Sequence, residues 1–359
     1  MKKEKHNGLV SLWKFIFCVV IAIYHGQLLY GNEPVPLFRG GYIAVELFFL
    51  ISGYFFAKSA LKEKYNGESI GKDTISFVWK RMKKLIPYII VIYIIWLIFL
   101  IIYSKPPLTI SQIVNSIWNP LLFRTFGFRA PFMVTAVWYL TVLFTCMLIL
   151  YPILKKYRDN FILLASPIIA LFFLGYLNHH YYGLDISYAV WGDYICAAFI
   201  RGFAELNIGF IIYYLNQKLE KVEYTKIAKV FLTITPWIIL IIVLGITSFI
   251  PRHKEYDYIM LLLFTIALQI MVSGKTYDLK YFSNKFIFFL ESISMIIFIN
   301  HQFFRQVVLD HPFFENISLN KCLIIYVSAT IVFSIIEYLI ISRIQKLDLK
   351  RIRRFIIKE

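Results

Sequence analysis

The stretch LWKFIFCVVIAIYHG, residues 12–26, is apolar enough to lie in a membrane, yet it contains two ionisable side chains, Lys14 and His25. On a helix, eleven residues at 100° each return to within about 20° of the starting direction, so these side chains share one face, about 16 Å apart. An ionisable group at membrane depth is costly unless it faces a bundle interior or a wet cavity, and it therefore marks a candidate functional site. The alternative is that Lys14 snorkels to the headgroups and His25 lies near the opposite interface.

Composition predicts a polytopic membrane protein. The 359 residues are 59% apolar and 16% charged, and the mean hydropathy is +0.68, which is too apolar for a soluble domain of this size. The formal net charge of +17 is confined largely to short connectors between apolar runs, as orientation signals are, so we exclude nucleic-acid binding. The cysteines lie inside apolar segments without paired spacing, which predicts buried thiols; they are Cys18, Cys146, Cys196 and Cys322.

Apolar runs of about 20 residues predict an all-α fold with about ten transmembrane helices. They cover residues 9–30, 41–60, 84–104, 134–154, 160–177, 195–216, 228–250, 256–274, 286–310 and 322–342. If the N-terminus is cytoplasmic, the inner connectors and tails hold 27 of the 38 Lys and Arg residues and the outer connectors hold 7. This bias predicts that both termini are cytoplasmic.

The same pattern divides the chain into three parts. We expect a cytoplasmic N-terminal tail at residues 1–8, a transmembrane domain at 9–342 and a basic cytoplasmic tail at 343–359 on the anionic inner leaflet. No secretory cleavage site follows the first apolar run, so we expect that run to stay in the mature protein. Residues 105–133 contain several prolines and are predicted to form an interfacial helix and loop over the outer face, and residues 178–194 a second outer loop.

Glu46, Arg201 and Glu205 are further charges inside the apolar runs. Glu46 lies in the outer half of the second run and must be paired, protonated or hydrated there, with Lys14, His25 or Arg201 as the candidate partner. Arg201 and Glu205 are one helical turn apart and can form an ion pair inside the bundle. This pair is either a self-neutralised structural element or a group that orients a substrate hydroxyl.

A basic pair stands at the predicted inner start of the third run. Arg81 and Lys84 are three residues apart, so they share one helix face. Such a pair at a helix start can bind phosphate through its charge together with the exposed helix amides. The alternative is that these side chains only anchor the helix in the inner headgroups.

A second intramembrane histidine, His301, follows Asn300 in the run at 286–310. If that helix runs outward, His301 lies at the same depth as His25 and Glu46. Two imidazoles and one carboxylate at a common depth can form a proton-handling cluster.

Taken in order, these stretches resemble the acyltransferase-3 family of bacterial integral-membrane O-acyltransferases. In that family the first helix typically has an arginine and a histidine separated by ten residues, and lysine takes the place of the arginine here. The resemblance covers roughly residues 9–340, and its motifs are Lys14 with His25, Gly41 through Tyr54, Arg81 through Lys84, Trp138 through Leu140 with Tyr151-Pro152, Arg201 through Tyr213, and Ser292 through His301.

The resemblance implies an enzyme of the bacterial inner membrane that moves an acyl group, usually acetyl from cytoplasmic acetyl-CoA, to a hydroxyl of a cell-envelope glycan. Its partners would be membrane lipid and the glycan acceptor. Independently of the resemblance, the sequence contains no metal-ligand cluster, so we expect no metal. The expected donor-binding residues are Lys14, Arg81 and Lys84, the expected catalytic residues are His25 (as general base or acyl relay), Glu46 and His301, and the expected substrate-binding residues are Arg201, Glu205, Trp138 and Asn300.

Two other functions fit the same buried charges. A transporter or a flippase of a lipid-linked glycan would use them along a translocation path, although no repeat relates the two halves of the chain. A non-catalytic membrane scaffold would need them to face different neighbours.

Overall fold

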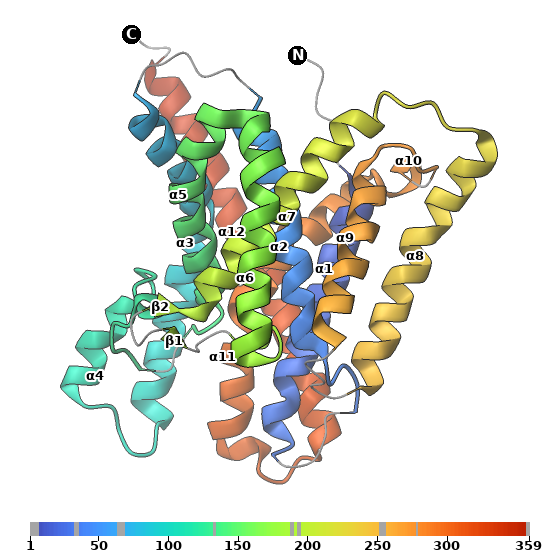
Figure 1. Ribbon diagram of the computed structural model, residues 1–359. Helices are drawn as coiled ribbons and strands as arrows, with labels where there is room; N and C mark the ends of the chain where they lie inside the picture. The colour runs from blue at the N-terminus through green and yellow to red at the C-terminus, as the bar shows by residue number, and fades with distance from the viewer. Residues whose placement is uncertain are drawn as a thin grey trace.

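The computed structural model is a bundle of long helices (Figure 1). It describes residues 7–31, 36–62, 69–131, 134–186, 190–191, 195–250, 256–277 and 279–356. The long helices are α1 (Gly8–His25), α2 (Ala44–Ala60), α3 (Ile70–Tyr103), α5 (Val137–Asn160), α6 (Ser166–Tyr181), α7 (Ala197–Leu219), α8 (Lys226–Phe249), α9 (Asp257–Val272), α11 (Lys285–Asp310) and α12 (Leu319–Ile356). The short elements are α4 (Ile110–Asn115), α10 (Leu279–Phe282) and the antiparallel pair β1 (Val190–Trp191) and β2 (Ile195–Cys196). The predicted all-α membrane fold is confirmed.

Eight segments of the described chain are long and apolar enough to cross a membrane. One of them, Val137–Tyr181, holds both α5 and α6. The chain turns between these helices at Arg158, where φ is 48° and ψ is −125°, and continues through a π-helical turn at Phe161–Ala165. α9 is shorter, with 16 residues. Each expected apolar run thus contains one long helix, while the number of helices that cross the membrane stays a prediction.

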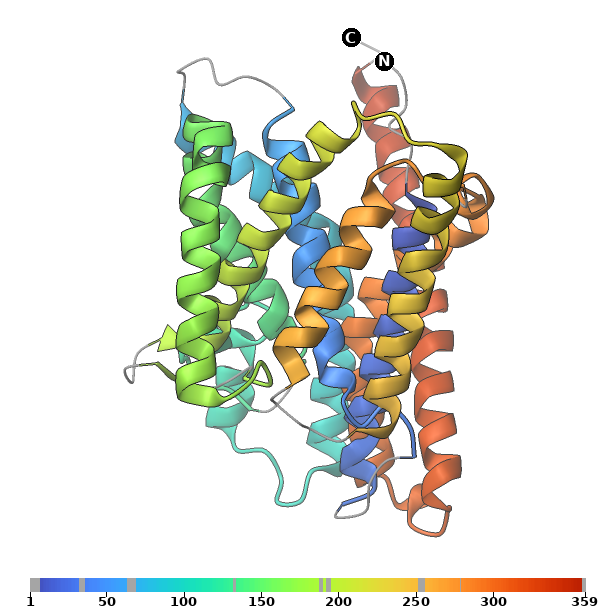
Figure 2. The same cartoon turned by 45° about the vertical axis from the view of Figure 1, so that its right-hand side comes forward.

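The start of α1 and the end of α12 lie on the same side of the bundle (Figures 1 and 2). We call this the terminal side, and the opposite side, which carries α4 and the two strands, the distal side. The charge pattern predicts that the terminal side faces the cytoplasm.

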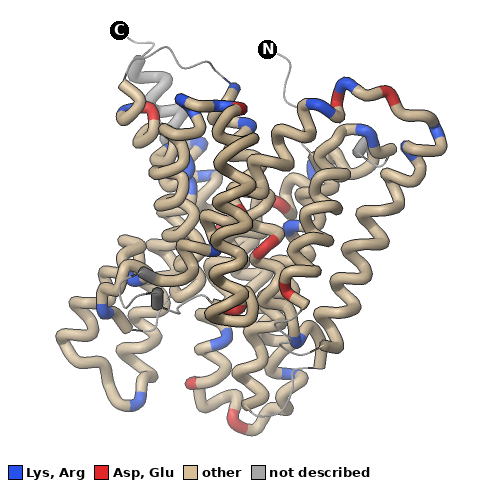
Figure 3. Tube along the Cα trace, viewed as in Figure 1, with Lys and Arg blue, Asp and Glu red and all other residues tan. Residues whose placement is uncertain are grey.

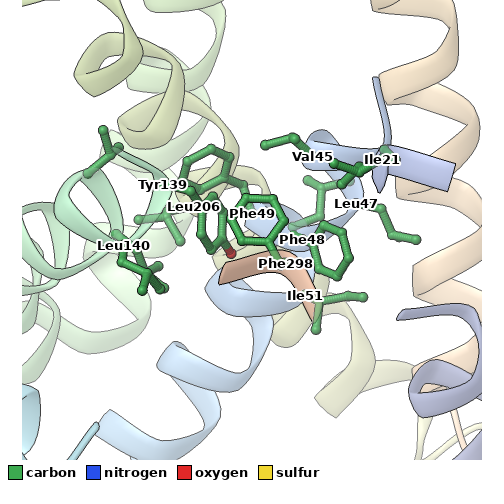
Figure 4. Close-up of a cluster of buried hydrophobic side chains, with 14 of the residues drawn as sticks. Ile21, Val45, Leu47, Phe48, Phe49, Ile51, Tyr139, Leu140, Leu206 and Phe298 are labelled. Carbon is green, nitrogen blue, oxygen red and sulfur yellow. The ribbon is translucent and has the colours of Figure 1, made fainter. Parts of the chain in front are cut away.

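α2 and α7 pack with their backbones close together. A Cβ atom on Gly53 would lie 2.5 Å from the carbonyl oxygen of Leu206, and one on Gly209 would lie 2.6 Å from that of Leu50. Only glycine therefore permits this approach at either position. Aromatic side chains fill the space beside the contact, among them Phe49 and others drawn in Figure 4. This core joins α1, α2, α5, α7 and α11 and fixes the helices that carry the polar side chains.

Several helices extend beyond the expected runs, and α3, α6 and α12 change the expected boundaries of other segments. α3 begins at Ile70, so Arg81 and Lys84 lie about three turns inside it, and the expectation that they stand at a helix start with free amides is wrong. The first turns of α3 are amphipathic, with Thr74 and Val78 buried one turn apart, and a hydropathy scan therefore missed them. α6 continues to Tyr181 and α12 to Ile356, beyond the starts expected for the second outer loop and the basic tail.

Residues 105–131 cover part of the distal side with α4 and two short 3-10 turns. Ile110, Val114, Ile117 and Leu121 form an exposed apolar stripe at helical spacing, and Figure 1 shows α4 beside the main bundle. An exposed apolar stripe of this kind is typical of a segment that lies in a membrane interface.

Candidate active site

A cavity of about 130 Å³ lies near the distal ends of α1, α5 and α7. Water occupies about 30 Å³ per molecule in the liquid, so the cavity has room for about four water molecules or for part of a small ligand. Its wall combines charged, amide, imidazole and aromatic groups. The lining residues are Ile21, Tyr24, His25, Tyr42, Val45, Ala136, Trp138, Asp185, Arg201, Phe298, His301 and Gln302.

His25 and His301 meet at this cavity. Their ring centroids are 5.0 Å apart, with 34° between the ring planes. Nδ1 of His301 is 2.7 Å from the carbonyl oxygen of Phe298. A carbonyl only accepts hydrogen bonds, so Nδ1 carries the proton, and in the neutral ring Nε2 holds the lone pair. Nε2 is buried and has no hydrogen-bond partner among the described residues. A neutral His301 therefore offers a proton-accepting nitrogen.

Arg201 is the ion-pair partner of Glu46. Arg201 Nε donates to Glu46 Oε2 at 2.9 Å and to Glu205 Oε1 at 3.3 Å, and Nη2 also donates to Glu46. The three residues are 2%, 0% and 0% exposed, and Figure 3 shows acidic positions inside the bundle as well as at its ends. Two carboxylates share one guanidinium here, so the cluster has an excess negative charge unless one carboxyl group holds a proton.

Trp138 and Gln302 complete the wall beside this cluster. The Arg201 guanidinium carbon lies 5.7 Å from the centroid of the Trp138 ring, which is a cation–π distance. The Thr135 hydroxyl donates to Gln302 Oε1. This contact orients the amide and leaves Gln302 Nε2 as a hydrogen-bond donor.

Asp185 enters the cavity from the loop that follows α6. Its Oδ2 atom lies 3.5 Å from the Tyr24 hydroxyl. The neighbouring Leu184 N–H donates to Asp257 Oδ2 at 2.7 Å, and the Tyr42 hydroxyl donates to Asp257 Oδ1 at 2.6 Å. Asp257 therefore holds the loop of Asp185 and the ring of Tyr42 in place at the start of α9.

The other predicted site residues lie outside the cavity wall. Asn300 donates to Ser334 Oγ at 3.1 Å and to Glu337 Oε2 at 2.8 Å, both on α12. Lys14 Nζ forms an ion pair with Glu291 on α11, at 3.1 Å from Glu291 Oε1.

The basic pair on α3 also lies away from the cavity. The Arg81 guanidinium lies over the Phe77 ring at 3.5 Å and donates to the Phe77 carbonyl at 3.0 Å, while Lys84 is exposed. The wall thus brings together four predicted residues, His25, His301, Arg201 and Trp138, with Glu46 and Glu205 bonded to Arg201.

Four polar wall residues were not predicted from the sequence, namely Tyr24, Tyr42, Asp185 and Gln302. Two of them had a local signal, because Tyr24 precedes His25 and Gln302 follows His301. Asp185 lies in the outer loop predicted at residues 178–194, and such a loop can form a wall for an acceptor, but the sequence did not distinguish Asp185 from the other polar residues of that loop. Tyr42 had no signal, since a tyrosine in an apolar run is common in membrane proteins.

Comparisons with known proteins identify the family of this chain. A family model described as an acyltransferase domain matches residues 9–341. No curated protein and no solved structure matches the chain. The matched range contains every residue of the cavity wall and nearly the whole chain, and the chain therefore belongs to the acyltransferase-3 family of membrane proteins.

Proposed function

We propose that this protein transfers an acetyl group from cytoplasmic acetyl-CoA to a hydroxyl of a cell-envelope polysaccharide, or of its precursor, in the bacterial plasma membrane. The observation that supports it most is the pair of imidazoles in a polar cavity, with His301 Nε2 buried and free of a partner among the described residues. A general base in this position is what transfer to a hydroxyl requires.

In the proposed reaction the acceptor oxygen attacks the thioester carbonyl carbon. The new C–O bond forms, the C–S bond breaks, and the proton of the hydroxyl passes to His301 Nε2 and then to the departing thiolate of coenzyme A. His25, 5.0 Å from His301 between ring centroids, is the second imidazole available for this proton. Arg201 and Gln302 supply N–H donors toward the cavity, where negative charge develops on the carbonyl oxygen.

The donor would bind toward the terminal side. Acetyl-CoA supplies the activated acyl group, and its phosphates need cations. Arg81 and the exposed Lys84 are three residues apart on α3 and can supply two. Lys14 already pairs with Glu291, so it would bind a phosphate only by sharing that carboxylate.

Reconstituted protein tests this proposal. In liposomes with acetyl-labelled acetyl-CoA and a glycan acceptor, the wild-type chain should transfer label to the glycan. His301→Ala and His25→Ala should each lower kcat by about 100-fold or more, the range for loss of a general base. His301→Asn retains a donor for the Phe298 carbonyl and removes Nε2, so it should be equally inactive.

His179→Ala is the matched control, because His179 is an exposed histidine in the last turn of α6. It should keep the wild-type rate. A folded His301→Asn or His25→Ala variant with wild-type turnover would contradict the role assigned to that imidazole.

A further inference from the structure

We propose that Asp185 binds hydroxyl groups of the acceptor and that the cavity discriminates against acceptors with a negative charge beside the reacting hydroxyl. This inference rests on the proposed function and adds to it the charge class of the acceptor. Three features of the cavity support it.

The first feature is the firm placement of the Asp185 carboxylate. Its two neighbours in the loop, Leu184 and Ile186, are 0% and 4% exposed, so the chain is anchored on both sides of it. The Leu184 N–H bond to Asp257 adds a polar anchor to α9. A loop held in this way keeps Asp185 in the wall without reorganisation when a ligand enters.

The second feature is the match between this part of the wall and a polyol. A carboxylate is an acceptor with two oxygens, so it can accept from two neighbouring hydroxyls of one sugar ring, and its charge strengthens both bonds. Tyr24, Tyr42 and Trp138 add ring surfaces to the same cavity, and these can cover the C–H faces of a sugar.

The third feature is the charge balance. Arg201 and Asp185 are the charged residues of the wall. The charge of Arg201 is already compensated by Glu46 and shared with Glu205. An anionic substituent on a sugar bound by Asp185 would lie beside that carboxylate. Repulsion between two unit charges about 4 Å apart in a partly buried site exceeds the energy of a tenfold change in rate.

Two glycosides of equal shape test the inference. Phenyl β-D-glucuronide carries a carboxylate at C6, and phenyl β-D-glucuronamide carries a neutral amide there, with the same hydroxyls. With the reconstituted chain and acetyl-CoA, the amide should be acetylated with a kcat/KM at least about tenfold higher. Asp185→Asn should raise the KM for the amide about tenfold, bring the two kcat/KM values closer together and leave the KM for acetyl-CoA unchanged.

Glu315→Gln is the control, since Glu315 is an exposed acidic residue on the same distal side but outside the cavity. It should keep the wild-type discrimination. Equal or better acetylation of the glucuronide by the wild-type chain, or full discrimination in Asp185→Asn, would overturn the inference. Turnover of acetyl-CoA without acetylation of either glycoside would overturn sugar binding at Asp185, whereas a chain that neither binds nor turns over acetyl-CoA would refute the proposed function instead.

Discussion

Two buried arginines of this protein have opposite surroundings. Arg201 donates to Glu46 and Glu205. Arg305 is 3% exposed, lies one turn after His301 on α11, and has no hydrogen bond or ion pair among the described residues. Removing a buried charge that has ion-pair partners changes the stability of a protein differently from removing one that has none. Substitutions of Arg201 and Arg305 therefore make a matched comparison.

Arg201→Met should strongly destabilise the protein, because it leaves two carboxylates buried without a cation. Loss of one partner of a buried ion pair costs about 3–5 kcal/mol. Arg305→Met removes a charge that no described carboxylate compensates, so it should leave stability unchanged or raise it. Thermal unfolding of both purified variants in detergent measures the difference. A loss of stability in Arg305→Met as large as in Arg201→Met would show that Arg305 has a partner of equal strength.

At the residue scale, the sequence predicted which residues share one face of a helix. It did not predict which residues contact each other across helices. The eleven-residue spacing correctly placed Lys14 and His25 on a common face, since both meet α11, at Glu291 and His301. The partner of Glu46 stayed open because three cations on other helices were equally possible. Asn300 was predicted to lie in the site together with His301, but it lies outside the cavity wall. Adjacent residues on a helix point about 100° apart, so Asn300 faces α12 while His301 faces the cavity.

At the scale of elements, the contact between α2 and α7 places Glu46 against Arg201. Gly53 and Gly209 permit the close approach two turns farther along the same two helices. Small residues at such contacts are the general means by which membrane helices approach closely.

Gly53→Ala and Gly209→Ala should each destabilise the protein by about 1–3 kcal/mol, the range for overpacking a well-packed site. The added methyl group would meet backbone atoms at 2.5 Å and 2.6 Å, and backbone cannot rotate away as a side chain can. We expect a lower unfolding temperature together with lower acetyl transfer, because the displaced helices carry the Arg201 cluster.

Gly175→Ala is the control for the same chemical change inside a helix. A Cβ atom at Gly175 would have no neighbour within 4 Å, so alanine should be neutral or stabilise α6 by up to about 1 kcal/mol through its higher helix propensity. Equal unfolding temperatures for Gly53→Ala and Gly175→Ala would mean that the approach of α2 to α7 is looser than the structure indicates.

Element ends were predictable where hydropathy changed abruptly and not where a helix became amphipathic. The run expected at 228–250 is α8, Lys226–Phe249. The run expected from residue 84 begins at Ile70 instead, because the exposed polar face of early α3 lowers its mean hydropathy without interrupting the helix. The turn at Arg158 separates α5 from α6 although the sequence there has no glycine or proline to mark it.

At the scale of the whole molecule, the distribution of charge and the path of the chain agree. The predicted inner connectors and tails hold 27 Lys and Arg residues, and the start of α1 and end of α12 lie on one side (Figures 1 and 2). The cavity of the candidate active site lies toward the opposite side, near the end of α1 and the starts of α5 and α7. If the terminal side is cytoplasmic, the proposed function requires that the acceptor reach His301 from outside the cell while the donor phosphates stay near the inner leaflet.

Cysteine labelling in intact cells tests this orientation. The four native cysteines are buried and unbridged, so the wild-type chain should react little with a membrane-impermeant maleimide. Glu315→Cys, in the exposed distal connector between α11 and α12, should react in intact cells. Glu223→Cys, in the exposed connector between α7 and α8 on the terminal side, should react only after the membrane is permeabilised. The reverse pattern of labelling would place the cavity toward the cytoplasm, and the acceptor would then have to be acetylated there.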